Sequence, residues 1–415
     1  MNSQGKKKQN PLQMSWVAGL LSLVFTAGCS SSAISMDASK AIGSSSALGA
    51  TASSSPTSSN TAAVLTSTSA LSQMSPGWNL GNTLEAIGSG AAPFSSSQET
   101  AWGNPAATQA LMTAVKTAGF KSVRIPVSWT EYADSSNAIS PFWMRRVTEV
   151  VNAARSAGLY VIINVHWDGG WMQPTPAAQT AADAKLTRFW TQIATNFKDQ
   201  DDHLLFAGTN EIMVTNDYSP PTKANCAVQN GFNQTFVDAV RATGGNNATR
   251  FLVVQGYNTN IDYTVSCNAK LPLDTIPQKL MVEVHYYDPY DFTLNTSNSI
   301  WQWGATASNR AATETWANEA YTDAQFQKMK VNFIDKGVPV ILGEYAASLR
   351  TEHDANGTYR TLWDQYITRS AHLHGLVPMY WDNGPTSNHS SGLFNRATAT
   401  EAFPETIEAI VKAGS

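Results

Sequence analysis

Tyr160-Val161-Ile162-Ile163-Asn164-Val165 is a nearly continuous apolar run rich in β-branched residues, and it ends directly before His166. Runs of this length and composition are typical of strands buried on both faces of a parallel sheet. An amphipathic stretch, Phe142–Ala157, precedes the run and ends at Gly158, a residue favoured just after a helix. A second amphipathic stretch, Ala182–Phe197, follows it. This order predicts one repeating unit of a parallel α/β fold.

The same alternation continues on both sides of this unit, from Pro76 toward the C-terminus. The strand candidates are Gly77–Leu80, Ser122–Pro126, Tyr160–Val165, Leu204–Gly208, Phe251–Gln255, Leu280–Val284, Val340–Gly343 and Val377–Tyr380. Further helix candidates are Thr108–Ala118, Phe232–Thr243, Asp323–Lys336, Tyr359–His374 and Glu405–Lys412. Eight such units predict an α/β fold of the (β/α)₈ TIM-barrel class, and we place this domain at residues 72–415.

Polar and aromatic side chains stand at or just after the predicted strands. In chain order they are Asn79 with Asn82, Arg124, His166, Asn210 with Glu211, Tyr257, His285 with Tyr287, Glu344 and Trp381. The C-terminal ends of the strands meet on one face of a barrel, where enzymes of this fold carry their active sites. We therefore expect these side chains to converge there, with the two histidines exchanging hydrogen bonds around one point.

Two carboxylates belong to this set, Glu211 after the fourth strand and Glu344 after the seventh. Paired carboxylates on either side of a glycosidic oxygen are the equipment for its hydrolysis. We expect partial burial and repulsion from Glu344 to keep Glu211 protonated. Arg124 is expected to keep Glu344 ionised, and Tyr287 to hold its oxygen in line.

Seven short motifs, taken in order, resemble those of the cellulase family, glycoside hydrolase family 5. They are Gly77-Trp78-Asn79-Leu80-Gly81-Asn82, Val123-Arg124-Ile125-Pro126-Val127, Asn164-Val165-His166, Asn210-Glu211, His285-Tyr286-Tyr287, Leu342-Gly343-Glu344 and Tyr380-Trp381. The resemblance covers about Pro76 to Lys412, and its specificity comes from the order, since no single motif is decisive. It implies a barrel enzyme that cleaves β-glycosidic bonds with retention of configuration.

The resemblance also implies roles for individual residues. Glu211 is the implied acid/base and Glu344 the nucleophile, with no metal and no cofactor. The expected substrate-binding residues are Asn79, Arg124, His166, Trp167, Asn210, His285, Tyr287 and Trp381, of which Asn210 bonds the sugar 2-hydroxyl. Trp167 departs from the family pattern, where many members carry a second histidine, and this alters a subsite wall. Ile212 replaces the usual proline after the acid/base, which alters only the turn.

Two stretches, Gly208–Met213 and Val284–Pro289, look like the branch of the family that acts on β-1,4-linked and mixed-linkage glucans. We therefore expect a secreted endo-β-glucanase of cellulase or lichenase type. A β-mannanase or xyloglucanase stays open, because these enzymes share the same catalytic residues. Aromatic candidates for sugar stacking are Trp102, Trp167, Trp171, Tyr257, Trp301, Trp303 and Trp381.

The overall composition is compatible with a neutral polymer as partner. Charged residues make up 14% of the chain, and the formal net charge is -4. Nucleic acids and anionic membrane surfaces both reward basic patches, so neither is an expected partner. The 13 Trp and 13 Tyr supply flat faces for sugar rings. We expect a monomer that binds β-glucan.

The N-terminal residues 1–29 resemble an export signal. Lys6, Lys7 and Lys8 precede a short apolar run that is typical of a secretory signal and too short to span a membrane. The run ends at Thr26-Ala27-Gly28-Cys29, which resembles a bacterial lipobox and predicts an outer-membrane lipid anchor at Cys29; simple cleavage and release is the alternative. Residues 30–71 are rich in Ser, Thr and Ala and predict a flexible linker.

Cys226 and Cys267 remain in the predicted catalytic domain. In an exported protein two cysteines are expected to form a disulfide, with two free thiols as the alternative.

Two other classes of function compete with the glycosidase hypothesis. A metal-dependent barrel hydrolase would use the same His and Glu side chains as ligands, but the chain has no His-x-His strand signature. A non-catalytic glycan-binding lipoprotein would need no carboxylate pair.

Overall fold

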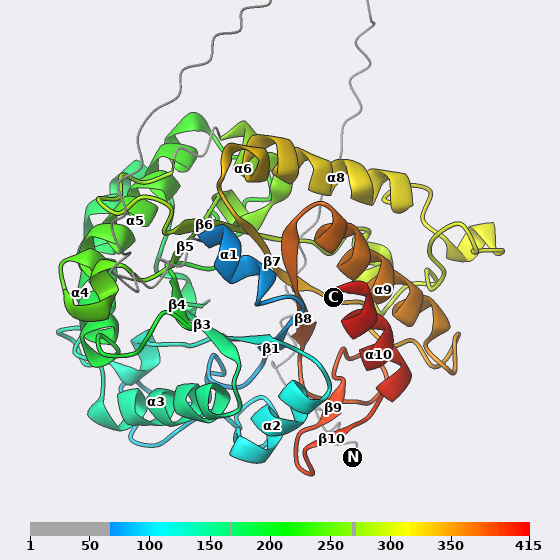
Figure 1. The fold of residues 1–415 in the computed structure, drawn as a ribbon, viewed down its shortest axis with the longest axis horizontal. Helices are drawn as coiled ribbons and strands as arrows, with labels where there is room; N and C mark the ends of the chain where they lie inside the picture. The colour runs from blue at the N-terminus through cyan, green and yellow to red at the C-terminus, as the bar shows by residue number, and fades with distance from the viewer. Residues whose placement is uncertain (1–66, 167, 268–270) are drawn as a thin grey trace, which may run out of the picture. The chain divides into compact units, whose positions relative to one another are not determined.

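Eight parallel strands close into a barrel in the computed structural model, which describes residues 67–166, 168–267 and 271–415 (Figure 1). The strands are β1 (Gly77–Leu80), β2 (Ser122–Ile125), β3 (Tyr160–Asn164), β4 (Leu204–Ala207), β5 (Leu252–Gln255), β6 (Leu280–His285), β7 (Val340–Tyr345) and β8 (Leu376–Asp382). Each strand pairs with the next in the chain, and β8 pairs back with β1. This closed sheet confirms the predicted (β/α)₈ barrel.

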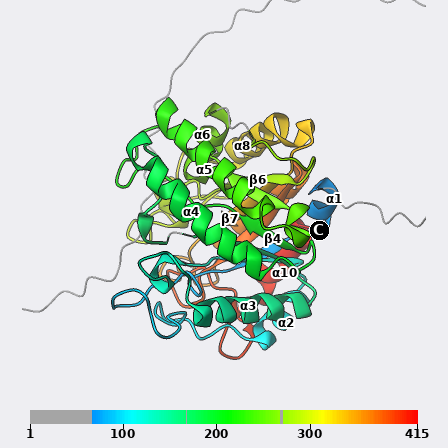
Figure 2. The same cartoon turned by 90° about the vertical axis from the view of Figure 1, so that its left-hand side faces the viewer.

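Helices surround the barrel (Figures 1 and 2). In the described ranges they are α1 (Ser67–Ser72), α2 (Gln109–Thr117), α3 (Pro141–Ser156), α4 (Pro176–Asn196), α5 (Lys223–Arg241), α6 (Ile261–Ser266), α7 (Tyr290–Thr293), α8 (Glu319–Asn332), α9 (Thr358–Leu373) and α10 (Pro404–Ala413). Short 3₁₀ turns lie at Thr130–Tyr132, Asp168–Gly170, Gly245–Ala248, Tyr257–Thr259, Arg310–Ala312 and Ile334–Lys336. A two-stranded hairpin, β9 (Phe394–Asn395) and β10 (Thr400–Glu401), precedes α10.

Helix α3 illustrates why these segments are helical. Its buried residues Trp143, Val147, Val150 and Ala154 recur every three or four positions, so they form one apolar face. A proline at the start of the helix costs no hydrogen bond, because the first N–H groups of a helix have no partner within it. This apolar face packs against apolar side chains of the strands, and together they form one hydrophobic core.

Three strands extend further than the sequence predicts. β6, β7 and β8 include His285, Glu344 and Trp381, which were expected just after the strands. The strand pairing shifts register at His285 and again between Leu342 and Tyr345. Irregularities of this kind redirect side chains and are common next to active sites. Three candidate residues are therefore held by the sheet itself and not by loops.

The folded domain begins before the predicted boundary at residue 72. Helix α1 lies over the centre of the barrel in Figure 1 and beyond the strands at the edge of the molecule in Figure 2. Ala70, Leu71 and Met74 are buried, and the Met74 carbonyl accepts a 2.6 Å hydrogen bond from the Ser122 hydroxyl at the start of β2. Residues 67–71 thus belong to the domain and not to the linker, because they cover the end of the barrel where the strands begin.

The predicted signal segment, Cys29 and most of the predicted linker lie outside the described residues, and so does Trp167. None of the helices in the described ranges combines the length and the apolar character that crossing a bilayer requires.

A disulfide joins Cys226 in α5 to Cys267 at the C-terminal end of α6. The two cysteines are 41 residues apart in the sequence. The bond links the helix that precedes β5 in the sequence to the helix that follows β5.

Candidate active site

Arg124 is the centre of a buried polar network at the C-terminal ends of the strands. Its Nη1 donates to Glu344 Oε1 at 2.9 Å and to Asn79 Oδ1 at 3.1 Å. Its Nη2 donates to Asn210 Oδ1, and its Nε lies 2.9 Å from Glu283 Oε1. A charge with no exposed surface must be paired in this way, because an uncompensated buried charge is strongly destabilising. The guanidinium therefore holds four side chains in fixed positions, from β1, β6, β7 and the segment after β4.

Asn79 and Arg124 do not offer a surface to a sugar. Both are fully buried, and the Asn79 amide donates to the carbonyl oxygens of Gly343, Met379 and Tyr380 while its oxygen accepts from Arg124. We therefore correct their expected role from substrate binding to positioning. The cause is the network itself, since the amide of Asn79 is taken up by backbone carbonyls and by Arg124, and the guanidinium of Arg124 by four side chains.

Glu344 and Glu211 lie close together but in different surroundings. A carboxylate oxygen of each lies within 4.8 Å of the other. Glu344, in β7, also accepts a 3.1 Å hydrogen bond from the Tyr287 hydroxyl, and its side chain is 6% exposed. Glu211 follows β4 with its backbone in the left-handed region, at φ +50°, and its side chain is 43% exposed. A non-glycine residue in that region is strained, which is common at functional sites.

The exposure of the Glu211 side chain corrects the expectation that this residue is partly buried. The buried member of the pair is Glu344, and burial raises the pKa of Glu344, although His285 and Arg124 oppose the shift. The reason is topological, because Glu344 belongs to a strand while Glu211 stands on the loop that follows one.

His285 lies between the carboxylates. Its Nδ1 is 2.8 Å from Glu211 Oε1 and 3.6 Å from Glu344 Oε2, and its Nε2 is 3.0 Å from Glu283 Oε1. Burial alone would lower the pKa of His285, but the three carboxylates outweigh burial and raise that pKa to about 9. The ring is therefore an imidazolium at neutral pH.

His166 and Trp381 form one wall of the site. Their rings are stacked, with centroids 5.8 Å apart and planes 8° from parallel. The Asn164 amide holds the His166 ring at Nδ1, 3.2 Å away. Burial lowers the pKa of His166 well below its usual value, and the positive charges of Arg124 and His285 add to the shift. His166 is thus a neutral ring beside a charged one.

The aromatic candidates divide by exposure. Tyr257 and Trp303 are buried in the core, with the Tyr257 hydroxyl accepting from the Val214 N–H and the Trp303 indole donating to Ala317, so neither is a stacking platform. Trp102 is 40% exposed, while Trp171, Trp301 and Trp381 are partly exposed. These four stay candidates for sugar contacts.

Glu283 is a site residue that the sequence analysis missed. It is fully buried and contacts both Arg124 and His285. The signal available in the sequence was a single acidic residue within an otherwise apolar strand, two positions before a candidate histidine. Residues two apart on a strand point to the same face, so Glu283 had to share the barrel interior with His285.

Glu211, His285 and Glu344 are also metal-ligand types, and their nearest atoms all lie within 4.8 Å of one another. A ligating histidine must be neutral, however, and both nitrogens of this ring face carboxylates that favour its protonated form. The donor set fits proton transfer better than metal binding. Asp201, Asp202 and His203 form a second such group at the surface, where Arg155 already pairs with Asp201.

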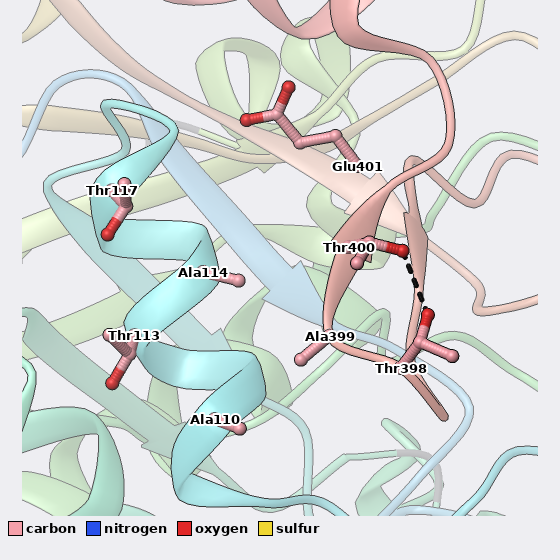
Figure 3. A pocket seen from close by; sticks show the side chains of 8 residues that line it. All are labelled: Ala110, Thr113, Ala114, Thr117, Thr398, Ala399, Thr400 and Glu401. Atoms are coloured by element: carbon pink, nitrogen blue, oxygen red, sulfur yellow. Dashed lines mark hydrogen bonds between the residues drawn. The ribbon is translucent and has the colours of Figure 1, made fainter.

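A separate open hollow lies outside the barrel, between α2 and the β9–β10 hairpin (Figure 3). Its lining consists of alanine and threonine side chains and one carboxylate, Glu401. Figure 3 shows Thr398 and Thr400 hydrogen-bonded to each other within the hairpin, at 2.8 Å. The hollow brings together no pair of groups that could perform hydrolysis.

A closed (β/α)₈ barrel with two glutamates side by side at its active face is the arrangement of a glycoside hydrolase. The sequence model of the cellulase family, glycosyl hydrolase family 5, matches residues 86–387, so the chain belongs to this family and is a glycoside hydrolase.

Three similar proteins extend this comparison. Endoglucanase A of Paenibacillus barcinonensis is 40% identical over 366 residues, covering 84% of this chain and 90% of the relative. The structure of a family 5 xyloglucanase from Paenibacillus pabuli is 40% identical with a TM-score of 0.79, covering 83% of this chain and 100% of that one. A broad specificity endoglucanase from Bacteroides salanitronis is 41% identical with a TM-score of 0.78, covering 84% and 95%.

Proposed function

We propose that this protein is a retaining endo-β-glucanase that cleaves β-1,4-glucosidic bonds by double displacement. The observation that carries the proposal is the pair Glu211 and Glu344, with oxygens within 4.8 Å of each other. Retaining glycosidases hold their two carboxyl groups about 5 to 5.5 Å apart, whereas inverting enzymes leave room for a water at about 6.5 Å or more. The short distance between the nearest oxygens supports the retaining arrangement.

Glu344 is the proposed nucleophile. Arg124 holds one of its oxygens and Tyr287 the other, so the carboxylate presents a fixed edge toward the substrate. Its attack on the anomeric carbon forms a covalent glycosyl-enzyme. The same two donors stabilise the carboxylate when it leaves again in the second step.

Glu211 is the proposed acid/base. It protonates the departing glycosidic oxygen in the first step and removes a proton from the attacking water in the second. Its side chain is exposed beside Glu344, where a bound sugar could contact it. His285 Nδ1 lies within hydrogen-bond distance and can share the proton.

The sugar in the subsite next to the scissile bond is proposed to contact Asn210, His166, Tyr287 and Trp381. The Asn210 oxygen is occupied by Arg124, which turns the amide NH₂ toward the 2-hydroxyl position; in the described part of the chain no partner takes that group. Trp381 supplies a partly exposed face backed by His166. Trp167 remains a proposed member of this wall.

The proposed substrate is a β-glucan with a 1,4-linked backbone, of cellulose or mixed-linkage type. Xyloglucan is the second candidate, because similar relatives include a xyloglucanase as well as endoglucanases. A β-mannanase receives no support from these relatives. The choice depends on the subsite walls, which the shared catalytic residues do not determine.

Export and anchoring are part of the proposal. Polysaccharides are too large to enter a cell, and the basic and apolar segments of residues 1–29 suit secretion. We propose that Cys29 is lipidated and that the linker holds a monomeric catalytic domain at the outer membrane. Mass analysis of protein isolated from a bacterial host's membrane would detect the acyl chains.

The test of the reaction is proton NMR of the first products released from barley β-glucan. The β-anomer should appear first and convert slowly to the α-anomer. Initial α-anomer would refute the mechanism. Relative rates on carboxymethyl-cellulose, barley β-glucan, xyloglucan and mannan then assign the substrate, and a rate highest on mannan would refute the glucanase proposal.

A further inference from the structure

Glu283 is a fully buried carboxylate in β6 that the mechanism above does not use. Its Oε1 lies 3.0 Å from His285 Nε2 and 2.9 Å from Arg124 Nε. Burial opposes its ionisation, but Arg124 and His285 outweigh burial and lower the pKa of Glu283. A negative charge is therefore held behind His285, on the side of the ring away from Glu211.

The neighbouring strand leaves room for this carboxylate. Residue 343 in β7 is glycine, and a Cβ there would lie 2.2 Å from Glu283 Oε1. Any other residue would push the carboxylate out of its place. Gly343 directly precedes Glu344 in the sequence. The glycine leaves space for Glu283, and the residue after it is the proposed nucleophile.

His285 connects Glu283 to the catalytic pair. With Nε2 facing Glu283, Nδ1 is left to face Glu211 at 2.8 Å and Glu344 at 3.6 Å. The charged or titratable groups that surround the ring are Glu283 in β6, Glu211 after β4, Glu344 in β7, Arg124 in β2, His166 after β3 and Tyr287 after β6. The three carboxylates outnumber the one permanent cation, Arg124. They therefore favour a protonated His285 ring, which donates a hydrogen bond from each nitrogen.

We propose that Glu283 is a positioning residue that acts through His285, fixing the ring and keeping on Nδ1 the proton that Glu211 uses. This inference rests on the proposed function, because it takes Glu211 as the acid/base. It also answers how a half-exposed carboxyl group obtains its proton. The arrangement is comparable to a buried aspartate that orients and charges a catalytic histidine.

The proton balance closes over one catalytic cycle. In the first step the Nδ1 proton passes to Glu211 and from there to the glycosidic oxygen. The bond between that oxygen and the anomeric carbon breaks, and Glu344 bonds to the anomeric carbon. In the second step a water molecule gives a proton to Glu211 and its oxygen atom bonds to the anomeric carbon, while the bond between the anomeric carbon and Glu344 breaks. The proton then returns to Nδ1. No other donor is required.

The test is Glu283→Gln, which keeps the shape of the side chain and removes its charge. The ratio kcat/KM is measured against pH on barley β-glucan and on dinitrophenyl cellobioside, whose leaving group needs no proton. On the glucan we expect the alkaline limb to move down by about one pH unit or more, with a loss of about tenfold or more at pH 8. On the dinitrophenyl substrate kcat/KM should change little.

A matched control separates action through His285 from action through Arg124. In a His285→Gln background, Glu283→Gln should cause no further movement of the alkaline limb, since the residue through which it acts is gone. If Glu283 served mainly to hold Arg124, both substrates would lose the same factor at every pH and in both backgrounds. That result would overturn the proposal.

Histidine NMR provides a readout on the unmodified protein, which is useful if Glu283→Gln does not fold. In ¹⁵N-histidine-labelled protein, the His285 signals are those absent from His285→Gln. We expect protonation of both ring nitrogens with a midpoint near pH 9. A midpoint near the ordinary value of 6.5 would overturn the proposal. Neither outcome depends on the product anomer, so failure here is distinct from failure of the proposed function.

Discussion

At the scale of single residues, the site assigns different environments to two identical side chains. Glu344 is buried and held by Arg124 and Tyr287, whereas Glu211 is half-exposed and contacts only His285 among these groups. A nucleophile benefits from fixed donors that orient it and stabilise it as a leaving group. An acid/base benefits from access to an incoming water. The proposed division of roles thus follows from the positions of the two residues in the barrel.

The first prediction concerns the nucleophile. Glu344→Ala should lower kcat on β-glucan by more than about a hundredfold, because the variant lacks the carboxylate that is proposed to bond to the anomeric carbon. Azide should restore turnover of an activated aryl cellobioside and give an α-glycosyl azide, which NMR identifies. Glu211→Ala is the matched variant, and with azide it should give the β-product. Residual activity of Glu344→Ala above about a hundredth of wild type would contradict the assignment.

The second prediction concerns stability and pH. The pKa of His285 is raised from 6.5 to about 9 in the folded protein, so its charged form stabilises the fold fully below pH 6.5, and this stabilisation is lost as pH rises through 9. The shift corresponds to about 3 kcal/mol. Urea unfolding at pH 6.5 and 9.5 should show a larger loss for wild type than for His285→Gln. An equal loss in the two proteins would contradict the prediction.

At the scale of secondary-structure elements, strands hold the catalytic machinery more rigidly than the sequence suggests. His285, Glu344 and Trp381 belong to β6, β7 and β8, and the strand pairing shifts register beside His285 and Glu344. The helices around the barrel pack against the outer surface of these strands. The link between α5 and α6 is the one covalent connection in this ring that the described residues show.

The third prediction concerns that link. The disulfide closes a loop of 41 residues, and removing it should cost about 2 to 4 kcal/mol of stability by releasing chain entropy in the unfolded state. The double variant Cys226→Ser and Cys267→Ser should unfold at lower urea concentration, while kcat on glucan stays nearly unchanged because neither helix carries a catalytic residue. Adding reductant to wild type should reproduce the shift, and adding it to the double variant should have no effect. Two free thiols in protein exported by a host would contradict the prediction.

At the scale of the whole molecule, the described domain is closed at one end by its own N-terminal segment. Met74 and Ser75 hydrogen-bond to Ser122 and Gly414, which ties the entry of the chain to β2 and to the C-terminus. The catalytic face lies at the opposite ends of the strands. The segment that covers one end, from α1 to Ser75, is therefore structural.

The fourth prediction separates linker from domain. A variant without residues 1–65 should keep the kcat of the full chain on soluble β-glucan, because a Ser/Thr/Ala segment adds reach but no subsite. A variant without residues 1–74 should unfold at lower temperature, because it loses the buried Ala70, Leu71 and Met74. Thermal unfolding and kcat measured on both variants test this. A large loss of kcat in the shorter deletion would show that the removed segment contributes to the site.

The sequence by itself determined the barrel and most of its active face. Apolar runs separated by amphipathic stretches specify buried parallel strands, and their C-terminal ends must share one face. Glu211, His285 and Glu344 could be placed on that face because each follows or ends such a run. The pattern is local and periodic, so it can be read without knowing which strands pair.

Only the tertiary structure decided how deep each side chain lies. It buried Asn79 and Arg124 completely, left Glu211 half-exposed, buried Tyr257 and Trp303, and brought Glu283 into the network. Depth depends on strand tilt, register shifts and the packing of distant segments, none of which leaves a local signal. The charge of His285 likewise depends on Glu283 from its own strand, Glu344 from β7 and Glu211 from the loop after β4, and only folding brings the last two to the ring.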